Sequence, residues 1–267
     1  MSINVIKQTF NKPLFSLLWL AGFVGELSTL WIDLPIDALA GAAESFPLSP
    51  LEIKLIGLVQ SVVILTAATW VGVKLSPKVR LAAPFFAAVA DRVARPWQAI
   101  QPQLIPAVVG GLAGFGLTLL WFLMLKPFLP GDFLVAGSQM TVPFVVRLLK
   151  GGIAEEIVLR WGVMTFLVWA FWRFLQRRKG RPYVGYVAVS ILISAIIFGL
   201  LHLPAAALLS TQITPALVLY IIVGNTWFGT VAGYLYWRIG LESAILAHML
   251  FHVVLTIVQW LSPSLLT

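Results

Sequence analysis

Residues 183–203 read YVGYVAVSILISAIIFGLLHL, a run of 21 positions without Asp, Glu, Lys or Arg. A helix of this length rises about 30 Å, which matches the hydrocarbon thickness of a bilayer. The sequence therefore predicts a transmembrane helix here. Six further apolar runs are long enough to do the same, at about residues 13–34, 53–75, 104–125, 143–172, 213–239 and 241–261.

The composition of the whole chain also indicates a membrane protein. Of its 267 residues, 60% are hydrophobic and only 10% are charged, whereas soluble domains carry about 25% charged residues. We predict an all-α, polytopic bundle of about seven transmembrane helices, with eight as the alternative. The sixth run can also be interpreted as two half-helices broken at Gly224 and Asn225. Residues 1–142 then hold N-terminal helices and a basic loop, and residues 143–267 form a helical core.

Composition also excludes several kinds of chemistry and one kind of partner. The chain has no cysteine, so disulfides, thiol nucleophiles and thiolate metal sites are absent. The net charge is +8, but no basic run is long enough to indicate nucleic-acid binding, and we expect no such partner. In a chain this apolar, a basic excess is typical of cytoplasmic loops.

The distribution of Lys and Arg predicts the orientation. With seven spans and a cytoplasmic N-terminus, 13 of the 18 basic residues fall in cytoplasmic segments. Arg160 lies inside a span, and the four on the other side are Lys54, Lys126, Arg147 and Lys150. The positive-inside rule favours this orientation, and we expect an integral protein of the plasma membrane.

Ionisable residues inside the spans are the candidates for function, because each costs about 2.5–3.5 kcal/mol at the bilayer centre. Glu26 is isolated in the first span. The others that lie away from the span ends all fall in the last four spans: Glu155, Glu156, Arg160, His202, His248 and His252. These include every histidine of the chain, so a shared polar site is predicted.

The fourth span contains GGIAEEIVLRWG at residues 151–162. Glu156 and Arg160 are one helical turn apart, so Arg160 can neutralise that carboxylate. Glu155 is rotated by about 100° and is free to act elsewhere. Two adjacent carboxylates in a low-dielectric site resist double ionisation, an arrangement that general acid–base chemistry needs. A polar clamp between helices, without chemistry, is the alternative.

The fifth and seventh spans supply imidazoles. Phe198 and His202 share a helical face, although a lone membrane histidine is more often a hydrogen-bonding residue than a catalyst. His248 and His252 are spaced i, i+4 and point the same way, which is also the spacing of a metal-binding helix. An interhelical hydrogen-bond ladder is the alternative for this pair.

These three segments together resemble the CPBP family of membrane proteins, also called the Abi or type II CAAX prenyl protease family. Its pattern is Glu-Glu-x-x-x-Arg, then Phe-x-x-x-His, then His-x-x-x-Asn or Asp. The first motif is matched in full from Glu155 to Arg160, and the second from Phe198 to His202. The third is matched only at its first position, because His252 stands where the family has Asn or Asp. The resemblance covers about residues 151–259.

The resemblance implies an intramembrane glutamic endopeptidase without a cofactor. Its substrate would be a membrane-associated or lipidated protein or peptide, with prenylated ones among the candidates. Amide hydrolysis needs an activated water and donors for the oxyanion. The roles carried over are water activation by Glu155 and His202, oxyanion stabilisation by His248 and His252, and support by Glu156, Arg160 and Phe198.

Two other functions stay open. The first is a zinc-dependent membrane metalloprotease with His202, His248, His252 and Glu155 as the ligands. The second is a non-catalytic scaffold, immunity-type protein or proton-coupled carrier.

The predicted orientation conflicts with the resemblance. The charge count places Glu155 toward the non-cytoplasmic half of the membrane, whereas family members that trim prenylated proteins open to the cytosol. Either the orientation is inverted, or the substrate is met on the other side, or the cavity reaches the midplane.

Overall fold

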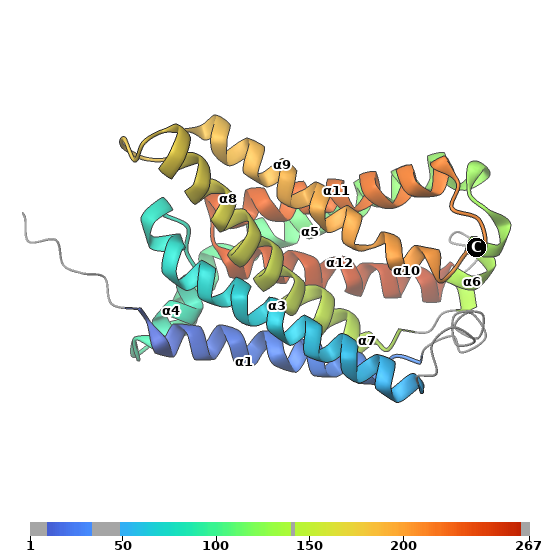
Figure 1. The fold of residues 1–267 in the computed structure, drawn as a ribbon, viewed down its shortest axis with the longest axis horizontal. Helices are drawn as coiled ribbons and strands as arrows, with labels where there is room; N and C mark the ends of the chain where they lie inside the picture. The colour runs from blue at the N-terminus through green and yellow to red at the C-terminus, as the bar shows by residue number, and fades with distance from the viewer. Residues whose placement is uncertain (1–9, 34–48, 140–141, 263–267) are drawn as a thin grey trace, which may run out of the picture.

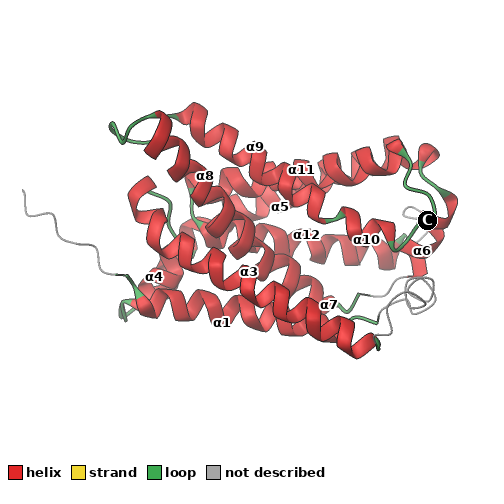
Figure 2. Cartoon of the chain, viewed as in Figure 1, coloured by secondary structure: helices red, strands yellow, loops and turns green. Residues whose placement is uncertain are grey.

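The computed structural model describes residues 10–33, 49–139 and 142–262. Within these ranges every regular element is a helix, and seven helical segments are long and apolar enough to cross a membrane (Figures 1 and 2). The predicted all-α membrane bundle is thereby confirmed.

The seven segments follow one another up and down through the bundle. They are α1 with η1 (Lys12–Ser28, Thr29–Trp31), α3 (Pro50–Val79), α5 with η3 (Gln101–Leu125, Lys126–Phe128), a fourth span made of α7, η4, η5, α8 and η6 (Phe144–Val146, Arg147–Glu155, Ile157–Met164, Thr165–Ala170, Phe171–Leu175), α9 with α10 (Val184–Leu201, Leu203–Ala207), α11 (Pro215–Arg238) and α12 (Leu241–Leu261). The short connecting elements are α4 (Pro84–Ala90), η2 (Pro96–Ala99) and α6 (Gly131–Gln139).

Side-chain caps explain where several spans begin. Asn11, Ser49 and Thr214 each accept a hydrogen bond from the backbone N–H three residues on, and each is followed by a proline in the first turn. Such caps satisfy N–H groups that the helix itself leaves unpaired. Between α11 and α12 the chain reverses at Gly240, whose φ of 154° is a conformation that other residues rarely adopt.

The sixth span is one continuous helix, so the alternative of two half-helices is wrong. The helix α11 runs without interruption past Gly224 and Asn225. Neighbouring side chains contact its backbone there, since Thr118 donates to the Gly224 carbonyl and Trp121 donates to the Tyr220 carbonyl. Polar contacts of this kind let a glycine persist in a membrane helix.

The fourth span occupies the middle of the bundle. On one side α1 packs on η4 and α3 packs on η5, and on the other α12 packs on η4 and α9 on η5. Helices from residues 1–142 and from residues 143–267 therefore pack against one another. That the second part is the catalytic core stays a prediction.

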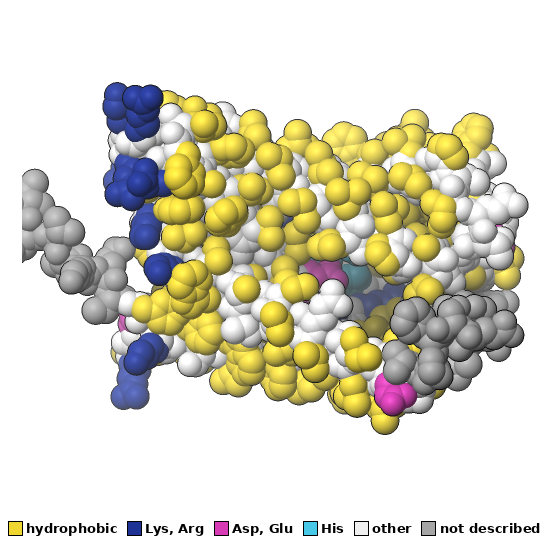
Figure 3. All heavy atoms as spheres, viewed as in Figure 1, with side chains coloured by type: hydrophobic (Ala, Val, Ile, Leu, Met, Phe, Trp, Pro, Cys, Tyr) yellow, Lys and Arg dark blue, Asp and Glu magenta, His cyan; other side chains and the backbone are white. Residues whose placement is uncertain are grey.

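The two ends of the bundle differ in charge. Lys and Arg side chains gather at the end where α1 begins, shown at the left of Figure 3. Because successive helices run in opposite directions, α3, η6 and α11 also terminate on this side of the bundle, and their basic residues lie there. The N-terminus of η4 lies at the opposite end.

Candidate active site

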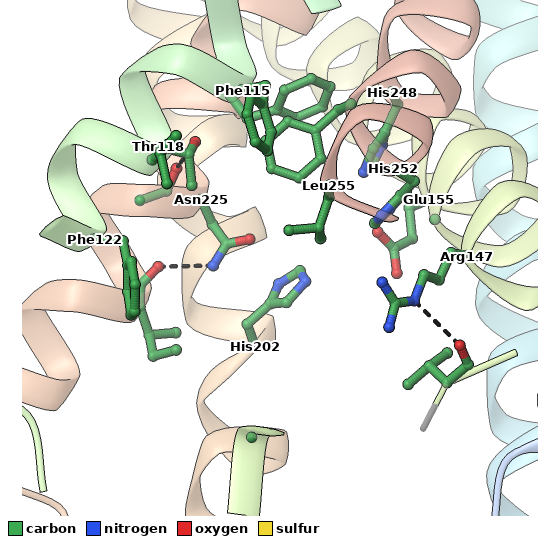
Figure 4. A pocket seen from close by; sticks show the side chains of 18 of the residues that line it. Phe115, Thr118, Phe122, Arg147, Glu155, His202, Asn225, His248, His252 and Leu255 are labelled. Atoms are coloured by element: carbon green, nitrogen blue, oxygen red, sulfur yellow. Dashed lines mark hydrogen bonds between the residues drawn. The ribbon is translucent and has the colours of Figure 1, made fainter. Parts of the chain in front are cut away.

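A cavity of about 530 Å³ lies inside the bundle. This volume is within the range of small-molecule and cofactor sites. Its wall includes the side chains of Glu155 from η4, His202 from the junction of α9 and α10, and His248 and His252 from α12 (Figure 4). The structure thus brings all four predicted catalytic residues to one space.

The cavity is placed in the half of the bundle away from the basic end. Ile32, Phe122 and the α6 residues Phe133 and Leu134 line it, and all come from the ends of helices or connections opposite the basic loops. Figure 3 shows a hollow in the side of the molecule where acidic, histidine and basic side chains are visible between hydrophobic ones. The polar interior is therefore reached through an apolar surface.

A buried polar network joins the fourth span to α12. The two carboxylate oxygens of Glu156 contact different partners: Oε2 lies 3.2 Å from Nε of Arg160, and Oε1 lies 2.8 Å from Nδ1 of His248. Glu156 and Arg160 are at most 1% exposed, and His248 is 3% exposed. The predicted pairing of Glu156 with Arg160 is present. The contact with His248, 92 residues away, is additional.

Phe198 connects this network to His202. Its ring lies 5.0 Å from the Arg160 guanidinium carbon and contacts the His202 ring edge-on, with centroids 4.7 Å apart. Its backbone carbonyl lies 2.8 Å from Nδ1 of His202. A carbonyl only accepts, so this contact places the proton on Nδ1 and leaves Nε2 to the cavity. The Phe-x-x-x-His spacing thus both fixes the tautomer and packs the two groups together.

His252 is held between η4 and its neighbour His248. The two imidazoles are stacked, with centroids 4.9 Å apart and planes inclined by 18°. On the other side, a Cβ built on Gly151 would lie 2.5 Å from Nε2 of His252, so only glycine admits this approach. Nδ1 of His252 is buried and has no hydrogen-bond partner among the described residues. A buried orphan of this kind needs a partner from a substrate or water.

Glu155 differs from its neighbour Glu156 because no described residue forms a hydrogen bond or ion pair with its carboxylate. It lines the cavity and is only half-buried. Within the described ranges it forms no hydrogen bond or ion pair, whereas Glu156 engages two partners. The expected division between a free and a committed carboxylate is what the geometry displays.

A family description agrees with these motifs. The model of the Rce1-like type II CAAX prenyl endopeptidases matches residues 137–254. Over these residues, which are less than half of the chain, the sequence is similar to the Rce1-like family. No curated protein and no solved structure matches the chain. This match confirms the resemblance found in the sequence, and the seven apolar helices agree with a family of membrane-embedded proteases.

The matched region departs from the CPBP pattern at His252. A side-chain amide does line the cavity, but it comes from another helix. Asn225 of α11 lines the same space and donates from Nδ2 to the Ile221 carbonyl at 2.8 Å. From the sequence alone, Asn225 was notable only as a point where the helix could break. Its position as a polar residue within an apolar span was the signal that could have identified it.

The zinc alternative finds no ligand cluster in the described ranges. No three His, Asp or Glu side chains there lie close enough together to hold a metal ion. The Nδ1 contacts of His248 with Glu156 and of His202 with a carbonyl leave the Nε2 atom of each ring available, so these contacts do not decide the question. The choice between a glutamic and a zinc enzyme therefore stays with the chelation experiment described below.

Glu26, predicted to be isolated, has a partner. Both of its carboxylate oxygens lie 2.8 Å from Nζ of Lys150, which also lines the cavity. The two residues are 124 positions apart, so no local pattern reveals the pair. Glu26 therefore joins α1 to η4 through an ion pair with Lys150.

Proposed function

We propose that this chain is an intramembrane glutamic endopeptidase in which Glu155 and His202 activate the attacking water. The observation that carries the proposal is the pair of free groups facing one cavity: an unpaired carboxylate at Glu155 and the Nε2 atom of His202. Ionised Glu155 and neutral His202 can both accept a proton from a water placed between them. The fixed tautomer of His202 supports this role.

His248 and His252 are proposed as donors to the oxyanion. Attack by the water oxygen on the carbonyl carbon forms a tetrahedral intermediate, while the water proton moves to Glu155. When His248 carries both protons, Nδ1–H donates to Glu156 and Nε2–H is left to bind the oxyanion. His252 offers a second imidazole with an unpaired Nδ1. Collapse of the intermediate breaks the C–N bond, and the proton held by Glu155 passes to the leaving amine.

We infer that the cavity opens on the non-cytoplasmic side of the cell membrane. The basic end of the bundle is assigned to the cytoplasm by the positive-inside rule, and the lining residues belong to the opposite end. The substrate would be a membrane-associated or lipidated protein or peptide that presents its cleavage site there. The apolar surround of the hollow suits a lipid chain, and prenylated peptides are one class to test.

The test is cleavage of a peptide library by purified protein in detergent, read by mass spectrometry. Wild-type protein should cut, cutting should survive a metal chelator, and Glu155→Gln should abolish it while the protein stays folded. Glu52→Gln is the matched control, because Glu52 is an exposed carboxylate in a helix cap away from the cavity. Near-normal turnover by Glu155→Gln would refute the assignment. Loss of cutting on chelation would favour the zinc enzyme, and no cutting by any variant would favour a scaffold.

A further inference from the structure

The loop at residues 176–183 joins the fourth span to α9 at the basic end of the bundle (Figure 1). It reads QRRKGRPY. Figure 3 shows Lys and Arg side chains gathered at this end of the surface. The proposed hydrolysis uses none of the loop's cations, all of which are exposed: Arg177, Arg178, Lys179 and Arg181.

The positive charge of this loop is not balanced within the described structure. None of its four cations forms an ion pair with a described residue. The chain has no Asp or Glu between Glu156 and Glu242, so α9, α10 and α11 carry no acidic residue either. The other basic loop at this end differs, because Asp91 directly precedes Arg92 there. Like charges held close together repel one another, so the loop favours an anion from outside the chain.

Gln176 holds the loop in one shape. Its side chain is only 5% exposed. Nε2 donates to the carbonyls of Lys179 and Arg181, and Oε1 accepts from the backbone N–H of Tyr183 at 2.9 Å. A single neutral side chain therefore fixes the backbone from which the cations project.

The backbone at Arg177 and Arg178 is held in an uncommon conformation. Their φ angles are 53° and 60°, in the left-handed region that residues other than glycine seldom adopt. The indole N–H of Trp172 donates to the Gly180 carbonyl at 2.9 Å and closes the turn around them. Backbone strain that is maintained by surrounding hydrogen bonds is often found at functional sites. Here it fixes the directions in which two adjacent guanidinium groups leave the chain.

We propose that this loop binds the phosphate of an anionic phospholipid in the leaflet at the basic end. Phe174 and Leu175 before the loop and Val184 after it are exposed hydrophobic residues, and Tyr183 is 60% exposed. Apolar and aromatic exposure on both sides of a cationic loop places it at the depth of the lipid headgroups. Guanidinium groups bind phosphate through charge-assisted, often bidentate hydrogen bonds, and basic residues at this depth attract anionic lipids.

Native mass spectrometry of the full-length protein in non-ionic detergent tests the proposal, because it resolves each bound lipid. The protein is titrated with dioleoyl phosphatidylglycerol or with dioleoyl phosphatidylcholine, which has the same acyl chains but no net charge. Each basic side chain near an anionic headgroup contributes a factor of about five in affinity. We therefore expect the first phosphatidylglycerol to bind at least about tenfold more tightly than the first phosphatidylcholine.

Three variants separate a shaped site from general positive charge. Arg177→Asn with Arg178→Asn should reduce the preference to less than about threefold, since Asn tolerates the left-handed backbone but carries no charge. Gln176→Ala keeps every charge and should still lower the preference at least about threefold, because the loop loses three hydrogen bonds. Arg92→Asn with Arg95→Asn is the matched control, since it removes two exposed cations from the same end and should preserve the preference. Circular dichroism checks that each variant is folded.

Equal affinity of wild-type protein for the two lipids would overturn the proposal. So would a preference that survives the double substitution in the loop, one that is lost equally in the control pair, or one that Gln176→Ala leaves unchanged. Displacement of phosphatidylglycerol by glycerol phosphate at matched ionic strength would assign the loop to a soluble phosphate and would also overturn it. The measurement involves no cleavage, so its outcome is independent of the endopeptidase proposal.

Discussion

Replacing Arg160 by Met tests whether the buried network stabilises the bundle as its geometry indicates. The substitution keeps an unbranched side chain of similar length but removes the cation that lies 3.2 Å from Oε2 of Glu156. It also removes the hydrogen bond to the Gly229 carbonyl and the contact with the Phe198 ring. Glu156 is 0% exposed, so its charge cannot be compensated by water.

Breaking a buried ion pair from one side costs about 3–5 kcal/mol. At about 2–4 °C per kcal/mol for a large domain, the melting temperature should fall by roughly 6–20 °C. The assay is thermal unfolding in detergent, followed by intrinsic tryptophan fluorescence. Arg181→Met is the control, because Arg181 is exposed in a loop at the basic end and should change the free energy of unfolding by less than about 0.5 kcal/mol.

The double variant Glu156→Gln with Arg160→Met separates the pair from general damage. Because the uncompensated carboxylate is then gone, we expect the double variant to be more stable than the sum of the two single losses predicts, by at least about 1 kcal/mol. Strict additivity of the two single variants would refute the idea that they act as one pair. A melting temperature for Arg160→Met equal to that of wild type would refute the buried network itself.

Three further predictions concern the cavity and its rim. His252→Asn should keep the cleavage rate within about tenfold, because the amide still supplies an N–H donor, whereas His252→Leu should lose about 10²–10³ of the rate; equal loss in both would contradict the donor role. Gly151→Ala should lower the cleavage rate with little loss of protein, because the added methyl meets Nε2 of His252 at 2.5 Å; Gly57→Ala, where a Cβ meets nothing, is the control. Asp132 ties α6 to the loop before α11: hydrogen bonds from the backbone N–H and hydroxyl of Thr211 lower the pKa of its carboxyl to about 2. Because this pKa is lowered in the folded protein, these hydrogen bonds should be intact above the unfolded pKa of about 4 and should weaken as the pH falls from there toward about 2. Faster hydrogen exchange of the α6 amides in wild-type protein than in Asp132→Asn at pH 7 would contradict this role.

The spans were predictable because hydrophobicity acts locally along the chain. The run at residues 183–203 needs no knowledge of its neighbours to be recognised as membrane-spanning. The same local logic failed at Gly224 and Asn225, where a break was considered. What keeps α11 intact there is a hydrogen bond from Thr118, a residue 106 positions away.

That the four candidate residues lie around one space was predictable, but their connections to other spans were not. Helical periodicity was enough to separate Glu155 from Glu156, because it places Arg160 on the face of the second glutamate. It could not reveal that Glu156 also meets His248, or that Lys150 reaches Glu26, because both contacts join distant spans. The π-helical winding of η4 and η5 around Glu156 likewise has no sequence signal, although such winding is often found at functional sites.

The basic residues that violate the overall charge bias are explained by the cavity. Four of them fall on the side opposite the basic end, and two of these four, Arg147 and Lys150, line the cavity. Lys150 is held there by Glu26, so its position follows from a structural ion pair. Arg147 has no such partner among the described residues, and the orientation set by Val142 and Gln259 points its charge inward. The cavity, rather than the positive-inside trend, therefore accounts for the position of both cations, because a charged side chain within a span is tolerated where it faces a polar interior.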